Sequence, residues 1–166
     1  SVLTSLEHVY IPQVFRMMFR GQDDASQRIG RYLTPYFYCS LLIPITVILF
    51  IDEALHVLVA PPFYDVKYPI MILSAYYGQM FFGKVNGAQF LYRKKMWYVT
   101  PFGLLRLSLH AGFALLCVQR YGAVGAALAL FASGVIVDGI SLWVAHREFP
   151  IAYELKFVLP IMLLFY

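Results

Sequence analysis

Two long apolar runs are separated by a very short polar turn, and the chain there reads Arg120-Tyr121-Gly122-Ala123-Val124-Gly125-Ala126-Ala127-Leu128-Ala129. The runs cover residues 100–119 and 122–145. So short a connection leaves no room for a soluble domain, so the two flanking helices are predicted to be antiparallel neighbours. The glycines and alanines that follow the turn allow the second helix to lie close against another helix.

The composition indicates a membrane protein. Of the 166 residues, 61% are hydrophobic and only 13% are charged, whereas roughly 25% are charged in a soluble domain. Cys39 and Cys117 both lie in apolar runs and form no disulfide or metal-binding pattern. The net charge is +4, but the basic residues cluster in short loops. This is typical of membrane topology and does not predict a nucleic-acid partner.

The order of apolar runs predicts an all-α polytopic membrane protein, an antiparallel bundle of about six transmembrane helices. The predicted spans are 1–18 (partial), 32–51, 68–92, 100–119, 122–145 and 157–166 (partial). Since ~20 residues are needed to cross a bilayer, the first and last spans are expected to be truncated. We expect Pro12 to interrupt the first helix, and residues 54–60, too short to span, to lie at the membrane surface.

Lys and Arg are distributed unevenly between alternate connectors. One side carries eight, Arg20, Arg28, Arg31, Arg93, Lys94, Lys95, Arg147 and Lys156, and the other carries two, Lys67 and Arg120. Because cytoplasmic loops are rich in Lys and Arg, loops 19–31, 93–95 and 146–156 are predicted to be cytoplasmic. The turn at 120–121 is then predicted to face the outside.

Four ionisable side chains fall within the predicted spans, namely Lys84, Arg106, His110 and Asp138. At ~1.5 Å per residue, Lys84, Arg106 and Asp138 lie roughly 12, 9 and 10 Å from the inner ends of their spans. Three charges at one depth suggest a hydrated cationic cavity for an anionic head group. The alternative is an ion pair between Arg106 and Asp138, with Lys84 extending to the inner surface. His110 is more often a hydrogen-bonded interhelical residue than a proton relay.

Helix phase separates the polar residues of span 68–92 into two groups. Asn86 and Gln89 belong to one polar stripe, while Lys84 points nearly the opposite way, so both cannot face one cavity. Asn86 and Gln89 are candidate cavity residues, or else they only join helices through hydrogen bonds. In the next span Gly103, Arg106, His110 and Cys117 share one face. The small residues Gly83 and Gly87, and the ridge Gly125, Ala129 and Ser133, are explained by helix packing alone.

Enzymatic chemistry has little support in the sequence. We find no metal-ligand cluster, no glycine-rich phosphate loop and no nucleophile elbow. The one local cluster, His146-Arg147-Glu148, is explained by a solvated turn. We therefore predict no catalytic residue, no metal and no cofactor.

An ordered set of features resembles the C-terminal half of bacterial polysaccharide (O-antigen type) flippases, in the multidrug/oligosaccharidyl-lipid/polysaccharide exporter superfamily. The features are Pro12 before Phe15-Arg16, Pro44 within a span, Pro62-Phe63-Tyr64 in an outer loop, the basic turn Arg93–Lys95, and Tyr121–Ala127. The last of these resembles the Tyr-Gly-x-x-Gly-Ala-Ala opening of a late helix in that family.

The resemblance implies a transporter of about twelve to fourteen helices in two pseudo-symmetric lobes, with residues 1–166 forming a fragment of the C-terminal transmembrane lobe. It also implies a lipid-linked oligosaccharide, carried on polyprenyl pyrophosphate, as the substrate moved across the bacterial inner membrane. Membrane lipids and polysaccharide polymerase or assembly proteins are the implied partners. Family members bind pyrophosphate in a cationic cavity between the lobes, and Arg106 and Lys84 suit that role by depth and charge.

Two alternatives remain from the residues. A drug or cation antiporter of the same superfamily would need an acidic cavity. A non-transporting scaffold protein of envelope polysaccharide assembly would hold Arg106 and Asp138 in a closed ion pair.

Overall fold

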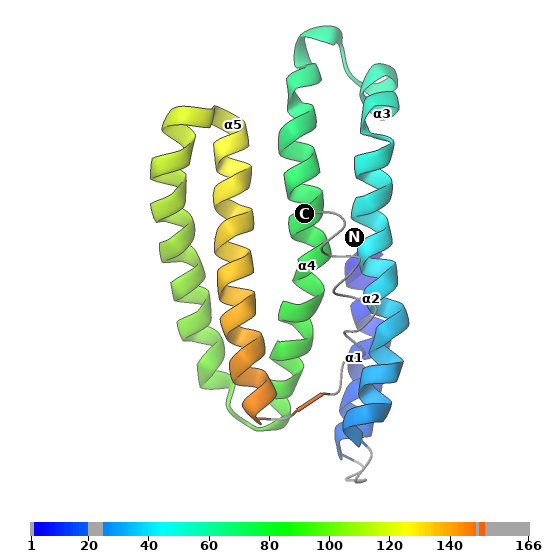
Figure 1. Cartoon of the computed structure of the whole chain (residues 1–166). Helices are drawn as coiled ribbons and strands as arrows, with labels where there is room; N and C mark the ends of the chain where they lie inside the picture. The colour runs from blue at the N-terminus through cyan, green and yellow to red at the C-terminus, as the bar shows by residue number, and fades with distance from the viewer. Residues whose placement is uncertain (1, 20–24, 149, 152–166) are drawn as a thin grey trace.

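The computed structural model describes residues 2–19, 25–148 and 150–151, and almost all of them are helical (Figure 1). The elements in order are α1 (Val2–Phe19), α2 (Ala25–Leu49), α3 (Ile51–Leu58), the 3₁₀ turn η1 (Pro61–Val66), α4 (Lys67–Tyr92), the 3₁₀ turn η2 (Met96–Tyr98) and α5 (Val99–Glu148). The described part of the chain contains no strand, so the predicted all-α class is confirmed. The last predicted span, 157–166, lies outside the described residues.

The predicted hairpin is present, and it forms α5. This element consists of two helices joined at Gly122, whose non-helical φ of 54° and ψ of −128° reverse the chain. A first arm (99–121) and a second arm (123–148) therefore run antiparallel (Figure 1). The turn is closed tightly, because a Cβ built on Gly125 would lie 2.2 Å from the carbonyl oxygen of Cys117. Only glycine fits at this position.

The second arm is packed between the first arm and α4 (Figure 1). Buried residues repeat every four positions along it, and all except Val137 are small: Gly125, Ala129, Ser133, Val137, Ser141 and Ala145. The second arm and α4 run parallel, and contacts between them keep a constant offset of 55 residues, as in Asn86 with Ser141 and Arg93 with Glu148. This one register sets which side chains of α4 meet the hairpin.

The opposite side of α4 packs against α1 and α2. The core there consists of Tyr10, Val14, Met18, Ile29, Leu33, Phe37, Val85 and Ile151. A Cβ on Gly78 would lie 2.9 Å from Cγ of Pro44, so α2 and α4 approach closely. Helix α4 is thus the central helix, with α1 and α2 on one side and the α5 hairpin on the other (Figure 1).

Helices α1 and α2 differ from the prediction. Helix α1 is not interrupted at Pro12, because Tyr10 and Val14 on either side of it are buried in the same core. Helix α2 begins at Ala25 instead of residue 32, so it includes the second half of the loop predicted at 19–31. Buried Ile29 anchors this early start.

Two stretches of the described chain, Ser26–Leu49 and Met96–Glu148, are long and apolar enough to cross a membrane. The second stretch contains the whole hairpin, and each arm exceeds the ~20 residues that a span requires. Helix α4 matches the predicted run 68–92 within one residue but is not among these stretches. Its polar side chains, which include Gln79, Asn86 and Gln89, interrupt its apolar run.

The described parts of the predicted basic connectors, residues 25–31, 93–95 and 146–148, lie at one end of the bundle (Figure 1). Phe19 at the end of α1 contacts Tyr92 at the end of α4, with ring centroids 5.1 Å apart. Ser26 Oγ, near the start of α2, donates to the carbonyl oxygen of Pro150 at 2.6 Å. The turn at Gly122 lies with α3 and η1 at the other end (Figure 1). We call the end at which Phe19, Tyr92 and Ser26 lie the basic end.

Candidate functional site

An ion pair joins the two arms of α5. Arg106 Nη2, from the first arm, donates to Asp138 Oδ1, from the second arm. The Asp138 side chain is only 9% exposed, whereas that of Arg106 is 31% exposed. The ion pair expected from the sequence as one alternative is therefore formed, and its cationic partner still reaches open space.

Asp138 retains hydrogen-bonding capacity beyond this pair. Its Oδ2 atom is buried and has no hydrogen-bond partner among the described residues. Gly83 of α4 packs directly over the carboxylate, since a Cβ built there would lie 2.9 Å from Asp138 Oδ1. Burial of an unsatisfied oxygen is costly. A water or a ligand beside Asp138 would lower that cost.

A cavity of about 230 Å³ lies beside the ion pair, between α4 and both arms of α5. Its charged lining consists of Lys84, Arg106 and Asp138, and its other walls are formed by Met80, Gly83, Gly87, Phe90, Val99, Phe102, Gly103, Val137 and Ser141. This volume is well above the ~10–15 Å³ that a single water needs. The cavity is thus large enough for a small anion such as a phosphoryl group.

The charge of the cavity favours an anion. It is lined by two cations and one carboxylate, and that carboxylate is already engaged by Arg106. Lys84 is exposed, while Asp138 is buried. An entering anion therefore meets the two cations before it meets the acid. Guanidinium and ammonium groups bind phosphate and carboxylate through short, charge-assisted hydrogen bonds.

Asn86 and Gln89 do not line this cavity. Both are fully buried, and Asn86 Nδ2 donates to Ser141 Oγ at 3.4 Å across the seam between α4 and the second arm. Lys84 lies on the cavity side, away from Asn86 and Gln89, but Gly83, which was expected on the same stripe as those two residues, also lines the cavity. The positions of Asn86 and Gln89 fit the alternative in which they join helices.

His110 lies one turn from Arg106 on the first arm but is not part of the cavity lining. Its Nδ1 atom is buried with no hydrogen-bond partner among residues 2–19, 25–148 and 150–151. The structure thus brings together three of the six candidate residues, Lys84, Arg106 and Asp138.

The sequence did not reveal the different roles of two glycines. Gly83 allows the close approach of Asp138, as a packing glycine does, but a Cβ on Gly87 would meet no atom within 4 Å. Gly87 therefore leaves the cavity open.

Two aromatic residues of the cavity wall were also not predicted from the sequence. They are Phe90 and Phe102, whose ring centroids are 5.8 Å apart. The shared face of Gly103 and Arg106 was the signal that pointed toward them.

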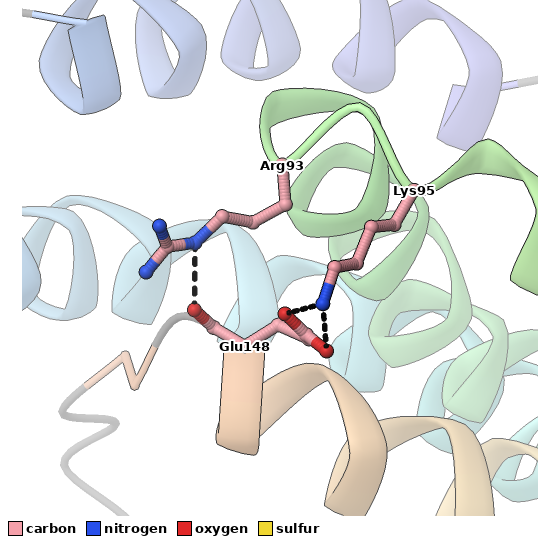
Figure 2. A network of polar contacts seen from close by, with 3 residues as sticks. All are labelled: Arg93, Lys95 and Glu148. Carbon is pink, nitrogen blue, oxygen red and sulfur yellow. Dashed lines mark hydrogen bonds and ion pairs between the residues drawn. The ribbon is translucent and has the colours of Figure 1, made fainter.

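A second polar cluster ties the hairpin to α4 at the basic end (Figure 2). Lys95 Nζ donates to both carboxylate oxygens of Glu148 at 2.8 Å, and Arg93 Nε donates to the Glu148 carbonyl oxygen at 2.8 Å. The Glu148 side chain is 19% exposed. The cluster His146-Arg147-Glu148 is therefore more than a solvated turn, because Glu148 fixes the end of the second arm.

A further ion pair lies at the other end of the bundle. Lys67 Nζ, at the start of α4, donates to Asp52 Oδ2 of α3 at 2.6 Å. This hydrogen bond raises the pKa of Lys67 above its usual value, with desolvation acting in the opposite direction. The contact fixes the short helix α3 against the start of α4.

Comparisons with protein families, with curated proteins and with solved structures find no match to this chain. In the described part of the chain, no three His, Cys, Asp or Glu side chains lie close enough together to hold a metal ion.

Proposed function

We propose that this chain is part of a transporter that flips a lipid-linked oligosaccharide across the bacterial inner membrane by alternating access. The observation that carries the proposal is the cavity in which Lys84 and Arg106 lie beside the buried carboxylate of Asp138. The phosphate groups that join the glycan to its lipid are the part of the substrate that this cavity would take. The sequence resemblance described above supplies the substrate class.

The membrane arrangement follows from the apolar stretches and from the basic end. Met96–Glu148 and Ser26–Leu49 supply spans, and α1 and α4 complete the lobe. The basic end faces the cytoplasm under the positive-inside rule. Arg106 and Asp138 then lie roughly 10 Å into the bilayer, at ~1.5 Å per residue. In that position a charged cavity is reachable from the inner leaflet, where the substrate is loaded.

Binding occurs by exchange of one oxyanion for another. A phosphate oxygen replaces Asp138 Oδ1 on the guanidinium of Arg106, and Lys84 supplies the second positive charge. The displaced carboxylate competes for Arg106 throughout. Competition keeps the affinity moderate, and a transporter needs moderate affinity because the substrate must also be released. The rest of the oligosaccharide extends away from the phosphate, toward the second lobe that the resemblance implies.

One observation favours the scaffold alternative. The Arg106–Asp138 pair is fully formed, as a non-transporting membrane scaffold of envelope polysaccharide assembly would require. The antiporter of cationic substrates is supported less well, because the cavity holds two cations and one acid.

The experiment is Arg106→Ala in the full-length protein, with polysaccharide export and membrane insertion both measured. The expected result is loss of export with normal insertion. Arg120→Ala is the matched control, since Arg120 is an exposed arginine of the same hairpin and its loss should leave export unchanged. Unchanged export in Arg106→Ala contradicts the proposal.

A charge swap separates the transporter from the scaffold. Arg106→Asp combined with Asp138→Arg re-forms the ion pair but moves the cation to the buried position. A scaffold whose function needs only the pair is restored by the swap. A transporter regains insertion but not export, because the cation no longer reaches the cavity opening.

A further inference from the structure

A buried serine hydroxyl lies on the wall of the cavity that holds the ion pair. Ser141 lines this cavity, as Arg106 and Asp138 do, and it is only 7% exposed. Its Oγ atom accepts a hydrogen bond from Asn86 Nδ2 of α4 at 3.4 Å. A serine hydroxyl is an acceptor and also a donor. Because one lone pair of Oγ faces Asn86, the hydroxyl hydrogen is directed away from Asn86.

This hydrogen is not donated to any acceptor among residues 2–19, 25–148 and 150–151. Other helical hydroxyls donate to a carbonyl oxygen three or four residues earlier, namely Thr34, Ser40, Thr46 and Ser133. Ser141 makes no such bond within the described ranges. The carboxylate of Asp138 does not take the hydrogen either, since its Oδ2 atom has no partner there. Ser141 therefore keeps an unused donor at the cavity wall.

The hydroxyl of Ser141 lies close to the place where an anion would bind. Asp138 and Ser141 are three residues apart on one helix, so their Cβ atoms are about 5–6 Å apart. An anion that replaces Asp138 Oδ1 on Arg106 lies beside Asp138. A phosphoryl group in that place bridges the guanidinium and the hydroxyl with one hydrogen bond at each side.

Phosphoryl groups and carboxylates differ in the oxygens that they present to such a pair of donors. The guanidinium of an arginine binds two oxygens of an anion side by side. A carboxylate has no third oxygen, whereas a phosphoryl group has one that lies outside the plane of the first two. A hydroxyl placed beside the arginine therefore gives phosphate a contact that a carboxylate lacks.

We propose that Ser141 is a further donor to the phosphoryl group held at Arg106, and that it makes the cavity select tetrahedral phosphate over planar carboxylate. Asn86 is a positioning residue, because its amide holds Ser141 Oγ and so directs the hydroxyl hydrogen. The proposal rests on the proposed function, since it assumes that an anion takes the place of Asp138 Oδ1 on Arg106. It adds the residue that determines specificity within that site.

Methylphosphonate and acetate are matched probes, because both carry a methyl group and they differ in the anionic group. Their affinities are measured by competition with labelled pyrophosphate, with the full chain in lipid nanodiscs. Ser141→Ala should weaken methylphosphonate binding by about two- to tenfold, the range of one neutral hydrogen bond. It should leave acetate binding unchanged. Arg106→Gln should weaken the binding of both probes.

Further variants separate a lost contact from a disturbed helix. Ser141→Thr keeps the hydroxyl and should keep the preference for methylphosphonate. Ser133→Ala is the matched control, because this buried hydroxyl of the same arm donates to the Leu130 carbonyl oxygen and does not line the cavity. Asn86→Leu alone should reduce the preference. In the Ser141→Ala background it should cause no further reduction, because the hydroxyl that it positions is already absent.

The outcomes distinguish the role of Ser141 from the anion site itself. Unchanged methylphosphonate binding in Ser141→Ala, or an equal loss for both probes, overturns the role of Ser141 and leaves the site at Arg106 in place. Failure of the unaltered protein to bind pyrophosphate contradicts the proposed function as well. Circular dichroism shows whether each variant has folded. If Ser141→Ala has not folded, Ser141→Cys gives the same comparison, because a thiol is a much weaker donor.

Discussion

Arg106 and Asp138 lie on opposite arms of one helical hairpin and meet across it as an ion pair, with the carboxylate buried and the guanidinium partly open to a cavity. The two side chains of the pair are therefore buried to different extents. Its acid is enclosed by Gly83 and the hairpin, and its base can turn toward another oxyanion. Because of this difference in burial, substitution of Arg106 and substitution of Asp138 should change the stability of the protein by different amounts.

Arg106→Ala should destabilise the protein more than Asp138→Asn. Loss of the arginine leaves a buried carboxylate unpaired, whereas loss of the charge at Asp138 leaves an arginine that still reaches solvent. Removal of one partner of a fully buried pair costs about 3–5 kcal/mol, and the partial exposure of Arg106 lowers the expected cost to about 1–3 kcal/mol. Thermal unfolding in detergent micelles measures the difference. Equal destabilisation by the two variants contradicts the unequal burial.

Gly83→Ala and Gly87→Ala should have different effects on the free energy of unfolding. The added Cβ at position 83 would lie 2.9 Å from Asp138 Oδ1, while that at position 87 meets nothing within 4 Å. Gly83→Ala should therefore cost about 1–3 kcal/mol through overpacking. Gly87→Ala should be neutral or stabilise the helix by up to about 1 kcal/mol. Unfolding measurements on both variants compare them directly, and a similar loss in each would show that both glycines pack against neighbours.

Gly125→Ala should disrupt the hairpin turn. Its Cβ would overlap the Cys117 carbonyl group, so the two arms must separate near the turn. Gly139→Ala is the control, because a Cβ at that position of the same arm meets no atom within 4 Å. Cysteine cross-linking between the arms reports the change. We expect reduced cross-linking in Gly125→Ala alone, and full cross-linking in both variants would contradict the tight turn.

The stabilisation that the ion pair between Lys67 and Asp52 gives should be lost when the pH is raised and not when it is lowered toward neutrality. The pKa of Lys67 is raised in the folded protein because its ammonium group donates to the Asp52 carboxylate. A raised pKa gives a stabilisation that is fully present below the unfolded pKa of lysine and is lost as pH rises through the folded value. The protection factors of the α3 amides, which correct for the base-catalysed intrinsic exchange rate, should therefore fall only at strongly alkaline pH. Lys67→Met should abolish that alkaline transition, and its persistence would assign it to another group.

The hairpin and the bounds of α4 were predictable because their signals are local. The turn at Tyr121-Gly122 and the apolar runs beside it determine the antiparallel arms, and α4 ends at Tyr92 as predicted, just before the basic turn. The common depth expected for Lys84, Arg106 and Asp138 depends only on spacing along a helix, and the structure places all three around one cavity.

The remaining features depend on contacts between distant residues. Gly83 and Gly87 are equivalent in the sequence, and they differ only because the second arm meets α4 at an offset of 55 residues. The same register brings Glu148 to Lys95, which no local pattern indicated. Helix α1 passes through Pro12 because of a core that includes Ile151, far away in the sequence.

Binding of pyrophosphate to the purified protein tests the central claim most directly. A charge-assisted contact contributes about 1.5–3 kcal/mol, so Arg106→Gln should weaken pyrophosphate binding by about 10- to 100-fold. Arg120→Gln, at the exposed turn of the same hairpin, should leave the affinity unchanged. Equal affinities in the unaltered protein and in Arg106→Gln would contradict an anion site at Arg106.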